Sequence, residues 1–166
     1  MSMLYQRPVT FRPVTLADAP ALWAACWPGQ RLADVELRLT DVVSRRARGL
    51  TWGYAVVVEG IVIGYGQIGR WGRRVEISDL MLSEGWRGRG IGTQLITFLL
   101  GLARIKGFHE VEIGVAGSNP RALALYRRLS FSNERSLTLD LGDGPEPAIY
   151  LMRQLVQPVS TSPGHE

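Results

Sequence analysis

The strongest constraint on the fold is a glycine-rich turn at 84–93, which contains Gly88, Gly90 and Gly92. The turn lies between a strand-like segment, 75–82, and a long apolar segment of helical character. Glycine has no Cβ atom, so the backbone amides of such a turn can approach an anion closely. The positive end of the helix dipole favours negative charge at the same point. The sequence therefore predicts a pyrophosphate site at this turn.

Strand-like and helix-like segments alternate along the rest of the chain. A Glu59-Gly60 pair between two β-branched runs is a hairpin signal, so the first half of the sheet should be antiparallel. The crossover from 75–82 to 111–115 should be right-handed and parallel. We expect an α/β fold (an α+β mixed sheet) in the order β-α-α-β-β-β-α-β-α-β-β, with a central mixed sheet flanked by helices. The expected strands are 9–14, 52–58, 61–68, 75–82, 111–115, 136–141 and 148–155, and the expected helices are 19–27, 34–48, 93–106 and 120–129.

The length of 166 residues predicts a single domain, which we place at 1–156. The remaining segment, 157–166, is rich in Pro, Ser, Thr and Gly and is expected to be a disordered tail. The chain has no apolar run long enough to span a membrane and no leader-like N-terminus. We therefore expect a cytoplasmic protein with no membrane partner.

Composition narrows the function classes further. The single cysteine, Cys26, excludes an internal disulfide framework and a multi-thiolate zinc site, and the two histidines are far apart. We therefore expect no metal. The formal charge of +4 suits an anionic ligand, but the arginines are scattered along the chain. Nucleic acid is therefore not an expected partner.

Two common phosphate-binding loops fit the turn at 84–93 poorly. A P-loop needs a Gly-Lys pair followed by Ser or Thr, which the chain lacks. A dinucleotide fingerprint starting at Gly88 would need glycine where Thr93 stands. Arg87 and Arg89 add positive charge to the turn, which favours anion binding over a purely connecting role.

Two segments resemble those of a known family. Arg87-x-x-Gly90-x-Gly92 is similar to the [Q/R]-x-x-G-x-[G/A] signature of the GNAT superfamily of acetyl-CoA-dependent N-acetyltransferases. The segment 119–131 resembles the helix N-x-x-A-x-x-L-Y-x-x-x-G-F of that family, with Ser130 in place of its glycine. The GNAT-like order of elements matches the order expected here, so the resemblance covers about residues 9–155.

The resemblance implies acetyl-CoA as the acetyl donor. Amides of 88–93 would bind its pyrophosphate, and the backbone of 80–82 would pair with its pantetheine arm as an added strand. Asn119 would contact the same arm, or act only as a helix N-cap. The implied acetyl-CoA contacts are Leu80, Met81, Leu82, Arg87, Gly88, Arg89, Gly90, Ile91, Gly92, Thr93, Asn119 and Tyr126.

The resemblance also implies three candidate catalytic residues. Tyr126 would protonate the departing thiolate, although it could instead be a packing aromatic. Glu76 lies six residues before Leu82, hence on the same strand face by period two, and would remove the amine proton. A solvated strand-end charge is the alternative role for Glu76. Asp79, expected on the opposite face unless a bulge intervenes, is the other candidate base.

The expected function is transfer of acetyl from acetyl-CoA to a primary amine by direct attack in a ternary complex. The acceptor is a small-molecule or peptide amine that the sequence does not identify. One alternative is a non-catalytic module of the same fold that binds acetyl-CoA, and another is a protein that binds a different nucleotide. Edge strands and the closing hairpin would allow a homodimer.

Overall fold

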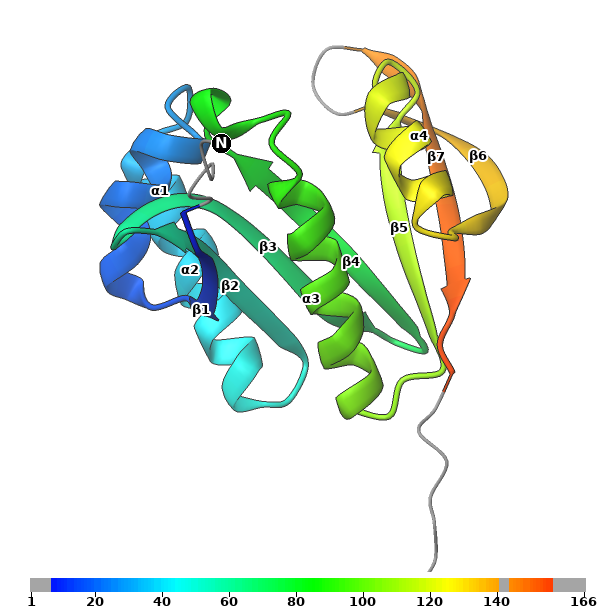
Figure 1. Ribbon diagram of the computed structural model, residues 1–166, viewed down its shortest axis with the longest axis horizontal. Helices are drawn as coiled ribbons and strands as arrows, with labels where there is room; N and C mark the ends of the chain where they lie inside the picture. Colours follow the sequence, from blue (N-terminus) through cyan, green and yellow to red (C-terminus); the bar gives the residue numbers. More distant parts are fainter. Residues whose placement is uncertain (1–6, 141–143, 157–166) are drawn as a thin grey trace, which may run out of the picture.

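The computed structural model describes residues 7–140 and 144–156, so the expected tail at 157–166 and positions 141–143 of the closing hairpin lie outside the described residues. The described strands form one mixed sheet in the order β1-β2-β3-β4-β5-β7-β6 (Figure 1). The strands are β1 (Val9–Pro13), β2 (Thr51–Val58), β3 (Ile61–Trp71), β4 (Arg74–Leu82), β5 (Glu110–Ala116), β6 (Ser132–Asp140) and β7 (Pro145–Gln154). The helices are α1 (Ala19–Cys26), α2 (Leu32–Ala47), α3 (Ile91–Ile105) and α4 (Pro120–Arg128), with short 3₁₀ turns η1 (Leu16–Asp18) and η2 (Glu84–Trp86).

The mixed sheet and the order of elements confirm the expected fold class. Five boundaries differ by two residues or more, two of them being the starts of α2 at Leu32 (expected at 34) and of β7 at Pro145 (expected at 148). The helix expected from position 93 begins at Ile91, because Gly90 takes a left-handed conformation (φ 79°) and acts as the N-cap. The strand expected from position 136 begins at Ser132, in an exposed edge segment that carries no alternating apolar pattern. The strand expected to end at position 68 continues to Trp71.

Helices cover both faces of the sheet. On one face, α3 buries Leu95 and Leu99 against Ile63, Ile68 and Ile77 of the sheet. On the other face, α1 and α2 enclose a smaller core around the fully buried Tyr65, with α1 contributing Leu22 and α2 contributing Val35 and Leu39 at its centre. We call these the α3 face and the α1/α2 face.

Strands β4 and β5 are parallel, as the crossover predicted, but they pair at only two positions. Glu76 is opposite Glu112 and Ile77 is opposite Ile113, after which the two strands diverge (Figure 1). Strand β5 stays paired with β7 as far as Ala116. The sheet is therefore split into two halves, β1–β4 and β5–β7–β6, joined at one end.

A β-bulge in β4 changes which side chains share a face. Ser78 pairs with Gln67 and Met81 with Tyr65, so two residues of β4 stand opposite one residue of β3. Asp79, with φ 52°, lies within this bulge. The side chains on β4 therefore do not alternate regularly through the segment.

The bulge overturns one sequence expectation. Glu76 and Met81 lie on the α1/α2 face, whereas Leu82 packs into the core under α3. Glu76 and Leu82 are thus on opposite faces, because the extra residue shifts the period-two alternation by one. Asp79 also faces α1/α2 rather than the side opposite Glu76, since its carboxylate bonds Arg38 of α2 at 3.2 Å.

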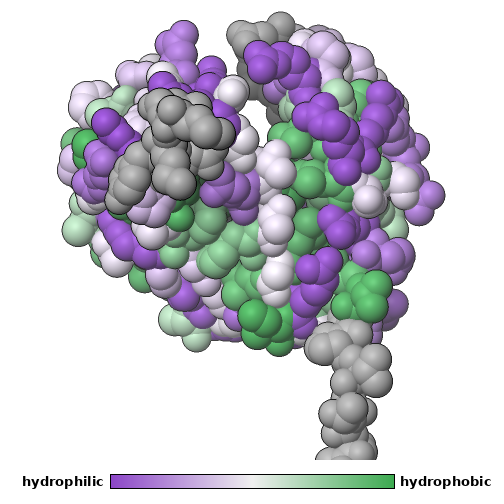
Figure 2. Space-filling model, viewed as in Figure 1, coloured by the Kyte–Doolittle hydropathy of each residue, from purple (hydrophilic) through white to green (hydrophobic). Residues whose placement is uncertain are grey.

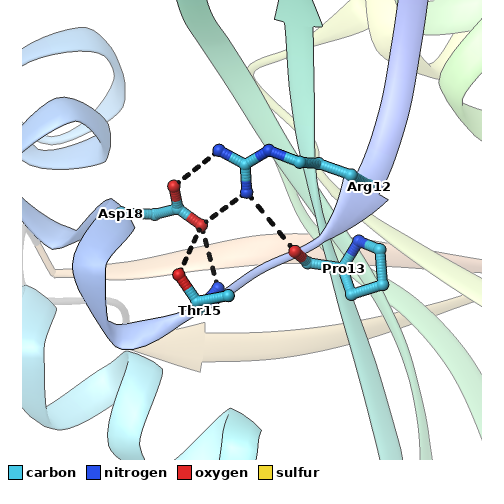
Figure 3. A network of polar contacts seen from close by, with 4 residues as sticks. All are labelled: Arg12, Pro13, Thr15 and Asp18. Atoms are coloured by element: carbon cyan, nitrogen blue, oxygen red, sulfur yellow. Dashed lines mark hydrogen bonds and ion pairs between the residues drawn. The ribbon is translucent and has the colours of Figure 1, made fainter.

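One buried carboxylate joins the end of β1 to the start of α1 (Figure 3). Asp18 is 7% exposed and accepts two hydrogen bonds from Arg12, at 2.7 and 2.8 Å, and one from the amide of Thr15 at 2.8 Å. These bonds, the Arg12 bonds above all, hold the pKa of Asp18 below its usual value. The network fixes the direction in which α1 leaves the sheet.

We predict that Asp18→Asn lowers the free energy of unfolding at pH 7 by about 1–3 kcal/mol, the cost of weakening a charge-assisted buried network. The pKa of Asp18 is lower in the folded state than in the unfolded state. Its contribution to the free energy of unfolding is therefore present above its pKa in the unfolded state and is lost as the pH falls through its pKa in the folded state. Urea denaturation at pH 7 and at acidic pH measures both effects. Asp34→Asn, which removes an exposed pair with Arg31, is the matched control, and an equal loss in the two variants at pH 7 would contradict the prediction.

Candidate active site

A cavity of about 450 Å³ lies between α3 and α4, at the end where the two half-sheets diverge. Figure 2 shows a furrow here with hydrophobic residues on its floor and hydrophilic residues along its α4 side. The floor is formed by β4, and the glycine-rich turn closes one end. The lining residues are Leu80, Met81, Leu82, Arg87, Gly88, Gly90, Gly92, Thr93, Leu95, Ile96, Arg121, Ala122, Leu125, Tyr126 and Arg128.

The turn at the start of α3 has the backbone geometry that the sequence predicted. Gly88 and Gly90 have positive φ angles of 71° and 79°, which only glycine adopts without strain. The amides of Ile91, Gly92 and Thr93, in the first turn of α3, have no intrahelical acceptor. The Ile91 side chain is buried in the core, so only its amide is available to a ligand. These amides form an anion-binding helix end beside the cavity.

Arginines reach this region from two sides. Arg87 lines the cavity and its Nε donates to the carbonyl of Leu82 at 3.1 Å. Arg89 stacks over Trp86 at 4.9 Å and does not line the cavity. Arg121 and Arg128 line it from α4.

The sequence analysis missed Arg121 and Arg128. Arg121, Leu125 and Arg128 stand at positions i, i+4 and i+7 of α4, so a helical projection places them on one face of the helix. That spacing alone does not distinguish a ligand-binding face from a solvated one, because which side of α4 faces α3 is set by the tertiary fold.

Tyr126 lines both cavities of the site, as does Leu80. It lines the α3–α4 cavity and also a second cavity of about 240 Å³, where β4 and β5 diverge. It is 7% exposed, its ring lies 6.1 Å from that of Phe131, and its hydroxyl has no hydrogen bond with a described residue. Burial raises the pKa of Tyr126, so the hydroxyl stays protonated at neutral pH. Tyr126 therefore both packs in the core and faces the cavities.

The second cavity, which we call the strand cleft, is lined by both diverging strands and by α4. Asn119 lines it and also caps α4, since its Oδ1 accepts from the amide of Ala122 at 3.1 Å. Beyond Ile77, β4 is not paired with β5. The edge of β4 that carries Leu80–Leu82 therefore has no β5 partner, which leaves backbone groups available to an extended ligand. All three residues line the α3–α4 cavity, and Leu80 also lines the cleft.

The two candidate bases differ in their partners. Asp79 is paired with Arg38, whose guanidinium also lies 4.9 Å over Trp27. The side-chain carboxylate of Glu76 has no hydrogen bond or ion pair with a described residue. Burial, followed by the charges of Glu112 and Asp79, raises the pKa of Glu76. Glu76 is therefore the carboxylate that can accept a proton without first losing an arginine.

Glu76→Gln should raise the midpoint of thermal unfolding at pH 8. The pKa of Glu76 is raised in the folded state, so its stabilising contribution is present below the unfolded pKa and is lost as pH rises through the folded pKa. The ionised side chain then destabilises the fold relative to glutamine, and the difference disappears near pH 4. Calorimetry at both pH values is the measurement, with Glu36→Gln on the exposed side of α2 as control. A lower midpoint for Glu76→Gln at pH 8 would contradict the assignment.

No helix in residues 7–140 and 144–156 is long and apolar enough to cross a bilayer. No three His, Cys, Asp or Glu side chains gather in them as a metal-ion site would require.

The family model for the acetyltransferase (GNAT) family matches residues 16–131. The protein belongs to the GNAT acetyltransferase family.

Relatives in sequence are named acetyltransferases. The L-methionine sulfoximine/L-methionine sulfone acetyltransferase of Pseudomonas aeruginosa is 32% identical over 88 residues, which cover 48% of this chain and 51% of that protein. The match thus spans about half the length of that relative. The glucosamine 6-phosphate N-acetyltransferase of Trypanosoma brucei brucei is 31% identical over 118 residues, covering 66% of this chain and 78% of that protein.

Solved structures with the same fold are more distant in sequence. The Salmonella typhimurium acetyltransferase that modifies the N-terminal serine of ribosomal protein L7/L12 has a TM-score of 0.79 at 16% identity, over 89% of this chain and 95% of that one. A Sinorhizobium meliloti phosphinothricin acetyltransferase in complex with acetyl-CoA has a TM-score of 0.72 at 23% identity, over 94% and 93%. At these identities the comparison establishes the fold alone.

Proposed function

We propose that the protein is an N-acetyltransferase that transfers the acetyl group of acetyl-CoA to a primary amine of a small molecule or peptide, by direct attack in a ternary complex. The observation that carries the proposal is the position of Tyr126, which lines the α3–α4 cavity and the strand cleft together. A donor in the first and an acceptor reaching the second would meet at its hydroxyl. Membership of the GNAT family and the names of the relatives support the same activity.

The residues around the α3–α4 cavity fit acetyl-CoA. Two positive-φ glycines and the free amides of the first turn of α3 suit a pyrophosphate, and Arg121 and Arg128 add positive charge. Among the described residues that line this cavity, none is acidic. The open edge at Leu80–Leu82 suits the amide groups of a pantetheine arm. When bound, acetyl-CoA supplies an activated acetyl thioester.

Glu76 and Tyr126 would carry out the proton transfers, Glu76 as general base and Tyr126 as general acid. An alkylammonium cannot attack until it loses a proton. Glu76 takes that proton through water, since it lies two residues before Ser78, a residue on the same face of β4 that lines the strand cleft. The amine nitrogen then bonds to the acetyl carbon as the carbon–sulfur bond breaks, and the nitrogen loses its second proton to solvent to give the amide. Tyr126 gives its hydroxyl proton to the departing sulfur and regains one from solvent. Asp79 is the weaker candidate base because Arg38 holds it.

We predict that Tyr126→Phe lowers kcat by about 100-fold or more, the usual contribution of a general acid. The affinity for acetyl-CoA should change little because the ring keeps its packing against Phe131. Steady-state kinetics and calorimetry separate the two effects. Tyr54→Phe, a core tyrosine under α3, is the matched control. Equal losses of turnover and affinity would mean that the hydroxyl serves binding instead.

A thiol-release assay with a panel of amines tests the function itself. The panel contains L-methionine sulfoximine, glucosamine 6-phosphate and a serine-initiated peptide, because similar proteins are named for these acceptors. We expect CoA release with at least one of them. Tight acetyl-CoA binding without turnover on any amine would favour the alternative, a non-catalytic binding module. Protection of the fold by NAD or ATP but not by CoA would contradict both.

Two expectations about the protein in the cell stay predictions. The sheet ends in strands β1 and β6, and pairing through these edges would produce a homodimer. A cytoplasmic location would supply acetyl-CoA to the site.

A further inference from the structure

Glu112 is a second carboxylate at the point where β4 and β5 begin to diverge. It lies directly opposite Glu76 in the two-residue parallel pairing, and cross-strand neighbours in a sheet are about 4.8 Å apart along the hydrogen-bonding direction. Both side chains lie on the α1/α2 face. Glu112 is only 7% exposed. Two carboxylates thus share one partly desolvated position at the closed end of the strand cleft.

The two carboxylates have unequal partners. Arg135 of β6 donates to Oε1 of Glu112 at 2.8 Å, and Arg74 of β4 lies 3.8 Å from Oε2. Each oxygen of Glu112 therefore faces a guanidinium, and its buried charge is compensated. Glu76 has no such partner among the described residues. Glu112 therefore faces Glu76 while its own carboxylate is paired with Arg135 and Arg74.

The charged and titratable groups around Glu76 come from β4, from β5 to β7 and from α2. The pKa of Glu76 is raised first by burial, then by Glu112 and then by Asp79, and is lowered by Arg74. Burial and the charges of Glu76 and Glu112 raise the pKa of Tyr150, which therefore stays protonated. The complete set is Asp79 and Arg74 on β4, Glu112 on β5, Arg135 on β6 and Tyr150 on β7, with Arg38 of α2 countering Asp79.

We propose that Glu112 is a positioning residue whose charge, held in place by Arg135 and Arg74, makes Glu76 hold a proton strongly enough to act as the base. The inference rests on the proposed function. A like charge across one strand spacing disfavours the ionised form of Glu76. Without Glu112, Arg74 would still lower the pKa of Glu76, but the charge of Glu112 would no longer oppose it. The charge of Glu112 therefore acts through Glu76 and not on the substrate.

Carboxyl ¹³C NMR titration of Glu76 tests the inference without any need for acetyl transfer. Glu112→Gln, which keeps the side-chain shape, should lower the measured pKa of Glu76 by about one unit or more. Glu110→Gln is the matched control, on the same strand and hydrogen-bonded to Gln154, and should leave the pKa of Glu76 unchanged. An unchanged pKa in Glu112→Gln, or an equal shift in the control, would overturn the inference.

The pH profile of kcat/KM supplies a readout that a purely structural role would not move. In Glu112→Gln the acidic limb should shift down by the same amount as the NMR pKa. Glu112→Asp, which keeps the charge, should restore most of the wild-type profile. Activity lost equally at every pH, with an unmoved limb, would contradict the inference. A shifted NMR pKa in a protein that acetylates no amine would leave the inference standing and contradict the proposed function.

A second variant keeps the test decisive if Glu112→Gln does not fold. Glu112→Gln with Arg135→Gln removes both members of the pair, so no buried charge is left uncompensated. Arg135 is not among the groups that shift Glu76, so the double variant should still lower the pKa of Glu76. A wild-type value in the double variant would overturn the inference.

Discussion

The two-residue pairing of β4 with β5 is the constraint on which the rest of the site depends. Because the strands pair only at Glu76–Ile77 and Glu112–Ile113, the sheet is continuous at one end and open at the other. The opening leaves one edge of β4 without a strand partner and forms the strand cleft. It also separates α3 from α4 enough to leave a cavity between them. Both cavities of the site thus follow from one interrupted ladder.

Local chemistry explains which features the sequence could predict. Element order followed from periodicity and turn residues, and the anion-binding turn followed from Gly88 and Gly90, whose backbone angles are local properties. Asn119 was predicted both as a contact and as a cap, and the cap bond is present. Ser130 stands where the family usually has glycine and still adopts the left-handed conformation, with φ 66°. The tertiary fold imposes that geometry on a residue that does not favour it.

The features that were missed depend on contacts between distant segments. The bulge at Asp79 is set by the pairing of β4 with β3, so the period-two rule placed Glu76 and Leu82 on the wrong relative faces. Glu112 gave no signal, because a glutamate in an apolar strand looks like any half-exposed position until Arg135 and Arg74 reach it. The arginines are scattered along the sequence, but the fold brings some of them beside buried carboxylates and places others in the lining of the α3–α4 cavity.

The distribution of ion pairs distinguishes Glu76 from the other carboxylates of the α1/α2 face. Asp18, Asp79 and Glu112 each lie beside an arginine, which offsets the cost of burying the charges of Asp18 and Glu112. An arginine beside a carboxylate also weakens it as a base, so a paired group is poorly suited to take a proton near neutral pH. Glu76 alone among these four lacks an arginine within ion-pair distance and lies next to a fixed negative charge. That placement costs stability, and it is the placement that the proposed base requires.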